Sequence, residues 1–172
     1  LLFWYGLCFS RFMSLDLNSA TGMFLGLAIG DAMGSPIEFE KPRPRDNYIR
    51  RYQSGGFHSV SKGEFTDDTS MALAMANALI ESQKTNGYPF DGHMIMNNFL
   101  DWRYNGKFSP REKCFDVGLT VNGALWKYKE DKTTPFTGCT HYKSAGNGGL
   151  MRLAPVLIVA KKKSEAIYLA RE

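Results

Sequence analysis

The chain has 172 residues, of which 44% are hydrophobic and 13% aromatic. This length and composition predict one globular domain with a sizeable core and exclude a disordered segment. The net charge of +4 is modest, and the basic runs 43–51 and 161–163 are expected to be solvated surface. They are consistent with weak attraction to phosphorylated ligands, but we expect no nucleic-acid partner.

The first twelve residues, 1–12, are apolar and aromatic with Arg11 as their only charge. Met13 resembles a natural start, and we interpret 1–12 as a lead-in outside the fold. A signal peptide is the competing interpretation, but no basic segment precedes the apolar run. The run is also too short to span a bilayer. We therefore expect residues 13–172 to form part of one domain, with no membrane partner.

Three cysteines, Cys8, Cys114 and Cys139, give an odd count without Cys-x-x-Cys spacing. This pattern predicts reduced thiols in a cytoplasmic protein. Cys139 and His141 could contribute to a zinc site, but no second pair of soft ligands stands nearby, so zinc is the minor alternative. His58 and His93 are isolated in the sequence, and a surface or core-edge position is expected for each.

The first predicted helix covers Asn18 to Gly34 and carries glycines at every fourth position: Gly22, Gly26, Gly30 and Gly34. Such spacing also occurs in membrane-spanning helix dimers, but here Asp31 interrupts the run and Pro36 follows it. We expect a buried helix whose glycines allow another backbone to approach closely. Asp31 lies near the helix C-terminus, where the dipole disfavours an anion, so it needs a hydrogen-bond partner or a cation.

Apolar residues recur at helical spacing through much of the remaining chain. They predict helices over Thr69 to Ser82, Asp91 to Tyr104 and Asp116 to Glu130, and a further helix starting near Ser164. Gly106 is a plausible stop for the second of these. No stretch alternates persuasively enough to predict a strand. The fold class predicted is all-α.

Thr66, Asp67 and Asp68 place two adjacent carboxylates and a hydroxyl at the start of the helix predicted from Thr69. Oxygen ligands of this kind suit Mg²⁺, Mn²⁺ or Ca²⁺, and a helix N-terminus tolerates concentrated negative charge. Helix capping is the alternative, because Asp and Thr are common in the first turn. The motif alone does not decide between a cap and a metal site.

Two other segments stand in a particular order around this motif. The first is GLAIGDAMGSPIEF, residues 26–39, and the second is SAGNGGLMRLAP, residues 144–155. With GEFTDDT, residues 63–69, between them, they resemble the ADP-ribosylglycohydrolase family, which includes the dinitrogenase-reductase-activating glycohydrolases. The resemblance runs from about Ala20 to Lys161 and corresponds to the amino-terminal portion of the family's domain.

The resemblance implies a compact orthogonal helical bundle, incomplete at its C-terminus, and a set of site residues. Thr66, Asp67 and Asp68 would bind Mg²⁺ or Mn²⁺, two ions in the complete enzyme. Glu38, which could otherwise be an exposed acid, would act with Asp68 in catalysis. From the residues alone, a flexible loop is a better interpretation of the glycine-rich segment than a phosphate-binding turn. By the resemblance its substrate-binding residues would be Asn147, Gly148, Gly149 and Met151, with Arg152 as a supporting contact.

The implied reaction is metal-dependent hydrolysis of the glycosidic bond that joins ADP-ribose to a protein side chain or a related conjugate. The partner would be an ADP-ribosylated protein or a small ADP-ribose conjugate. Family members carry a later Gly-Asp-x-Asp-Thr block with further metal ligands, and this sequence contains none. The chain is therefore expected to be an incomplete piece of the enzyme. The alternatives are a non-catalytic ADP-ribose-binding pseudoenzyme and a structural, crystallin-like protein.

Overall fold

The computed structural model describes residues 15–171, so the predicted lead-in and Cys8 lie outside the described residues. The described part consists of helices and loops, with one isolated antiparallel bridge between Gly55 and Val60. The all-α prediction is confirmed. The α-helices are α2 (Leu17–Gly34), α3 (Asp67–Asn86), α4 (Gly92–Asn105), α5 (Leu119–Glu130), α6 (Ala154–Val159) and α7 (Lys163–Arg171).

Helix α3 is longer than predicted at both ends, for local reasons. Asp67 and Asp68 lie in its first turn, where the helix dipole favours negative charge. At its C-terminus Gly87 adopts a left-handed conformation, with φ 71°, and ends the helix. Helix α4 ends in the same way at Gly106, with φ 74°, as the sequence predicts.

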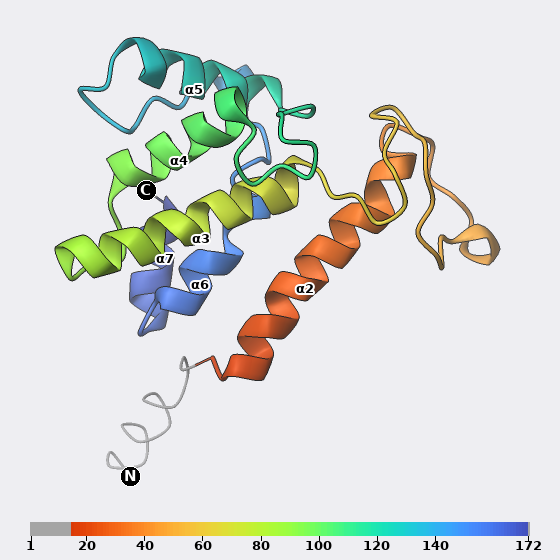
Figure 1. Ribbon diagram of the computed structural model, residues 1–172, viewed down its shortest axis with the longest axis horizontal. Helices are drawn as coiled ribbons and strands as arrows, with labels where there is room; N and C mark the ends of the chain where they lie inside the picture. The colour runs from red at the N-terminus through yellow and green to blue at the C-terminus, as the bar shows by residue number, and fades with distance from the viewer. Residues whose placement is uncertain (1–14, 172) are drawn as a thin grey trace.

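The helices form successive layers around α3. In Figure 1, α4 and α5 lie on one side of α3, and α6 and α7 lie on the other. The buried apolar side chains between them form one core cluster that includes residues from α3, α4, α5, α6 and α7. Its members include Met71, Leu79, Phe99, Trp102, Leu125, Val156 and Leu169.

Helix α2 forms where the sequence predicts it, but its predicted burial is wrong. Ala32 is its buried residue, whereas Leu17 is 81% exposed. A Cβ atom built on any of its four regularly spaced glycines would meet nothing within 4 Å among the described residues. Figure 1 shows the N-terminal half of α2 diverging from α3. The helix is anchored mainly near its C-terminal end, so no other part of residues 15–171 approaches its glycines closely.

Helix α5 begins at Leu119 instead of Asp116, and the residues before it form an irregular loop. Gly118 stands at the N-cap position in an extended conformation. This later start leaves Asp116 outside the helix. Among the helices of residues 15–171, none combines the length and the apolar character needed to cross a membrane.

Candidate active site

The N-terminus of α3 is held by a carboxylate from the end of α2. Both Thr66 and Thr69 donate their backbone N–H and their hydroxyl to Asp31, at 2.7 to 3.1 Å. Asp31 thereby has the hydrogen-bond partners that its place near a helix C-terminus requires. These long-range bonds join α2 to α3 and position the first turn of α3.

Asp67 and Asp68, in that first turn, line a cavity of about 970 Å³. Glu38, from the segment after α2, and Asp116, from the loop before α5, line the same cavity. Thr66 does not line it: the residue is 3% exposed and its hydroxyl donates to Asp31. Segments far apart in the sequence thus bring four carboxyl groups to one hollow.

His58 also reaches this cavity, and its imidazole lies between two of the acids. Its Nε2 is 3.3 Å from a carboxylate oxygen of Glu38 and 3.3 Å from one of Asp116. The backbone at His58 is held by Arg111, whose guanidinium donates to the His58 carbonyl at 3.2 Å and is paired with Glu64 at 2.6 Å. Aromatic rings surround the imidazole: Phe39, Phe57 and Phe115.

The proximity of these acids shifts their pKa values. The pKa of Asp67 is raised from 3.8 to about 6, first by burial and then by the charges of Asp116, Asp31 and Glu38. Burial, followed by the charge of Asp67, raises the pKa of Asp68 to about 6 as well. Burial also raises the pKa of Asp116. Raised carboxyl pKa values indicate negative charge that lacks sufficient compensation.

This donor set fits a divalent cation. Carboxylate oxygens are the ligands that Mg²⁺ and Mn²⁺ prefer. Within residues 15–171, His58 is the only basic side chain that forms an ion pair with any of the four acids. A cation between the acids would supply the missing positive charge and favour their ionised forms.

The glycine-rich segment forms another wall of the cavity. Asn147, Gly148 and Met151 line it, whereas Gly149 lines a neighbouring cavity. A Cβ atom on Gly148 would lie 2.9 Å from a Val121 methyl group, so the absence of a side chain permits this close approach. The segment leads into a short 3₁₀ helix, Leu150–Arg152, and then into α6.

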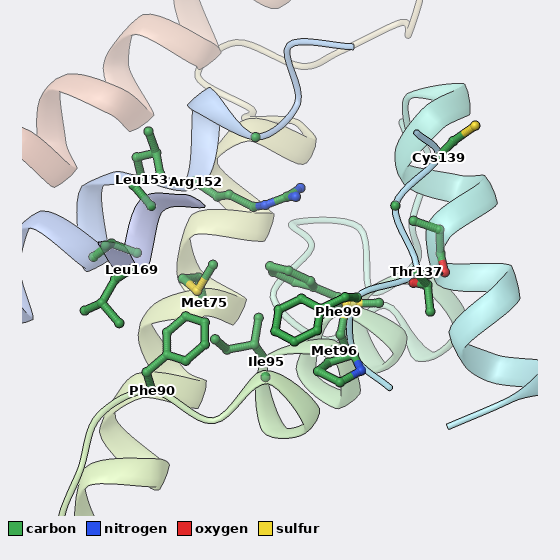
Figure 2. Close-up of a pocket in the computed structure, with 18 of the residues that line it drawn as sticks. Met75, Phe90, Ile95, Met96, Phe99, Thr137, Cys139, Arg152, Leu153 and Leu169 are labelled. Atoms are coloured by element: carbon green, nitrogen blue, oxygen red, sulfur yellow. Dashed lines mark hydrogen bonds between the residues drawn. The ribbon is translucent and has the colours of Figure 1, made fainter. Parts of the chain in front are cut away.

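The neighbouring cavity, of about 500 Å³, is mostly apolar (Figure 2). Figure 2 shows Met75, Ile95 and Phe99 gathered there, with Arg152 extending toward Phe99. The Arg152 guanidinium lies 5.1 Å from the centre of the Phe99 ring, and burial lowers its pKa. Arg152 therefore lines the apolar cavity and not the acidic one.

The structure brings together most of the site residues that the sequence predicts. Glu38, Asp67, Asp68 and the three residues of the glycine-rich segment named above share one cavity; their chemical roles stay predictions. Sequence reasoning missed His58, which was expected at the surface or the edge of the core, and Asp116, which was assigned to a helix. Neither residue stands in a motif with diagnostic spacing, so only the tertiary contacts reveal them.

Comparison with known proteins identifies the family to which this sequence and fold are similar. The sequence model for ADP-ribosylglycohydrolase matches residues 13–172. An ADP-ribosylarginine hydrolase, Tri1, from Serratia proteamaculans is 35% identical over 90% of this chain and 40% of its own length. The ADP-ribosyl-[dinitrogen reductase] glycohydrolase of Rhodospirillum rubrum is 32% identical over 82% of this chain and 44% of its own length.

A solved structure described as an ADP-ribosylglycohydrolase-related protein complex is similar in fold. It superposes with a TM-score of 0.67 and 34% identity, covering 88% of this chain and 46% of that chain. The chain belongs to the ADP-ribosylglycohydrolase family, as its three motifs predict. It spans about 40% of the length of the Serratia relative.

Proposed function

We propose that this chain takes part in divalent-metal-dependent hydrolysis of the glycosidic bond between ADP-ribose and a protein side chain or a related conjugate. The observation that carries the proposal is the gathering of Glu38, Asp67 and Asp68 at one cavity with the glycine-rich segment. The relatives named for ADP-ribosylarginine and ADP-ribosyl-[dinitrogen reductase] support a substrate of this class. The reduced-thiol cysteine pattern supports a cytoplasmic location.

In this proposal Asp67 and Asp68 hold Mg²⁺ or Mn²⁺ by their carboxylates. Thr66 has a different part, because its hydroxyl donates to Asp31 and helps to position the two acids. When bound, such an ion orients ribose hydroxyls and water and makes that water more nucleophilic. In this proposal Asp68 is both a metal ligand and a catalytic carboxylate.

Glu38 has the position of an acid/base group. Its side chain is 41% exposed at the mouth of the cavity, so it can exchange protons with solvent and with a bound substrate. Glycoside hydrolysis passes through a transition state that resembles an oxocarbenium ion, and carboxylates both stabilise that charge and transfer the proton. The backbone N–H groups near Asn147 and Gly148 would contact the ADP-ribose diphosphate.

The test compares ADP-ribose release from an ADP-ribosylated arginine peptide by the longer hydrolase of which this chain is proposed to be a piece and by variants of that hydrolase. With Mg²⁺ or Mn²⁺ the unmodified enzyme is expected to release ADP-ribose, and the double change Asp67→Asn, Asp68→Asn should lower the rate at least about 100-fold. Asp46→Asn, an exposed acid away from the cavity, is the matched control and should have no effect. Circular dichroism checks that each variant is folded.

The other outcomes discriminate among the alternatives. Unchanged turnover in the double variant would refute the site assignment. Binding of ADP-ribose without release by the unmodified chain would instead favour a non-catalytic binder. An intact fold with affinity for neither metal nor ADP-ribose would favour a structural protein.

A further inference from the structure

One part of the acidic cavity has the composition of a different kind of metal site. Glu38, His58 and Asp116 each offer one ligand atom, and these three atoms lie within 4.8 Å of one another. Two are carboxylate oxygens and the third is an imidazole nitrogen. This nitrogen sets the cluster apart from the Asp67–Asp68 pair, which offers oxygen alone.

The spacing of the cluster suits coordination of one ion. Transition-metal ions in proteins lie about 2.1 Å from imidazole nitrogen and from carboxylate oxygen. Two such ligands about 100° apart at the ion are about 3.2 Å from each other. The His58 Nε2 is 3.3 Å from the Glu38 oxygen and 3.3 Å from the Asp116 oxygen. The Glu38 and Asp116 oxygens lie within 4.8 Å of each other, and one ion could bind all three atoms once these two oxygens are about 4.2 Å apart or less.

The imidazole nitrogen has no hydrogen-bond partner among the described residues, although two carboxylates lie near it. The His58 side chain is only 10% exposed, and its Nε2 is buried without a well-directed hydrogen bond. A buried polar atom in this state is costly, and such atoms in native proteins often mark a missing ion or water. Because both neighbours of Nε2 are carboxylates, a cation is the ligand that satisfies all three groups.

The surrounding contacts favour a preformed site. Arg111 holds the backbone of the His58 segment through its carbonyl oxygens, while its charge is neutralised by Glu64. Phe57 and Phe115 pack edge-on against the imidazole, with ring centres 4.9 and 6.2 Å away. The ring therefore has little freedom to turn away from the carboxylates, so an incoming ion meets ligands that are already ordered.

We propose that Glu38, His58 and Asp116 form a second metal site, selective for a divalent transition-metal ion over Mg²⁺ and adjacent to the Asp67–Asp68 pair. Imidazole nitrogen binds Zn²⁺ or Co²⁺ far better than it binds Mg²⁺, which prefers oxygen. The ion would bring positive charge between Glu38 and Asp116. This inference goes beyond the proposed function, because it needs neither ADP-ribose nor turnover. An ion bound there would hold Glu38 deprotonated as a ligand and so remove it from its proposed acid/base role.

The test uses Zn²⁺ as the probe, titrated calorimetrically into the 172-residue chain in the presence of excess Mg²⁺. His58→Phe keeps a ring against Phe57 and Phe115 but removes the nitrogen ligand. It should weaken Zn²⁺ binding at least about tenfold, since even second-shell changes at metal sites cost 10–100-fold. Mg²⁺ binding measured without Zn²⁺ should stay unchanged.

The matched control is His141→Phe, the same change in the rival Cys139–His141 pair, and it should leave the His58 site intact. A loss of Zn²⁺ affinity in His141→Phe with none in His58→Phe would overturn the proposal. Thermal unfolding in a chelator checks that both variants are folded. Zn²⁺ binding should persist in the Asp67→Asn, Asp68→Asn variant, so this proposal and the proposed function can fail separately.

A second readout does not depend on any variant. In imidazole ¹⁵N spectra of the unmodified chain, Zn²⁺ should shift the Nε2 resonance of His58. This resonance is assigned by its absence from the spectrum of the His58→Phe variant. If the His58 resonance does not move while Zn²⁺ binds, the site lies elsewhere and the proposal is wrong.

Discussion

Helix α3 belongs to two regions of the molecule, of which one stabilises the fold and the other destabilises it. From Met71 to Leu79 it packs against α4 and α6, and its core-facing side chains are almost completely buried. One turn earlier, Asp67 and Asp68 face a cavity that contains other carboxylates. The first region gains stability from apolar burial, and the second loses stability from like charges held close together.

This difference shows how a site can be kept on a stable scaffold. The core region needs only apolar side chains at helical spacing. The acidic region depends on the bonds from Thr66 and Thr69 to Asp31, which fix the first turn of α3 despite the repulsion between its carboxylates. The following predictions test each side of this comparison.

The largest effect on stability is expected in the core. Trp102→Ala should lower the free energy of unfolding by about 3–5 kcal/mol, because Trp102 is 1% exposed and its loss leaves a cavity. Trp126→Ala is the matched control on α5; with Trp126 58% exposed, it should cost less than about 1 kcal/mol. Chemical denaturation of the metal-free chain measures both. Equal losses of unfolding free energy in the two variants would contradict the assignment of Trp102 to the core.

A smaller effect is expected where the two regions join. Asp31→Asn should cost about 1–2 kcal/mol, because the amide has one acceptor oxygen where the carboxylate has two charged ones. The charge of Asp31 also raises the pKa of Asp67, so the substitution should lower that pKa and recover part of the loss. Asp16→Asn, at the exposed cap of α2, should change stability by only a few tenths of a kcal/mol.

The third effect, similar in size to the second, concerns pH. Folding raises the pKa of Asp67 and of Asp68 from 3.8 to about 6, so between these values the folded state binds more protons than the unfolded state. The free energy of unfolding should therefore fall as pH rises from about 4 to about 7. With allowance for solvent screening, we expect a loss of about 1–2 kcal/mol from these two groups.

The same titration distinguishes the acidic region from the core. Excess Mg²⁺ should reverse the loss at about pH 7, because an ion bound to the folded state stabilises it. Asp67→Asn should weaken both the pH dependence and the Mg²⁺ effect, whereas Trp126→Ala should alter neither. Denaturation midpoints across the pH range provide the measurement. A stability that falls with rising pH as steeply in Asp67→Asn as in the unmodified chain would show that other groups dominate.

Much of this protein is determined by sequence patterns that act over short distances. The apolar spacing identifies α3 and α4, and Gly106 marks the end of α4, because helix formation depends on neighbours three or four residues apart. The adjacent carboxylates at the start of α3 likewise mark a candidate cation site. Three ordered motifs indicate the family, which the comparisons confirm.

Only the tertiary structure decided which other groups meet those carboxylates. His58 and Asp116 stand in loops, although the sequence pattern assigned Asp116 to a helix, and chain packing brings them to Glu38. The same holds for α2: its glycine spacing predicted a close packing partner, yet the helix joins the bundle mainly near Asp31. Periodicity specifies a helix and its faces, whereas contacts between distant segments depend on how all the helices pack together.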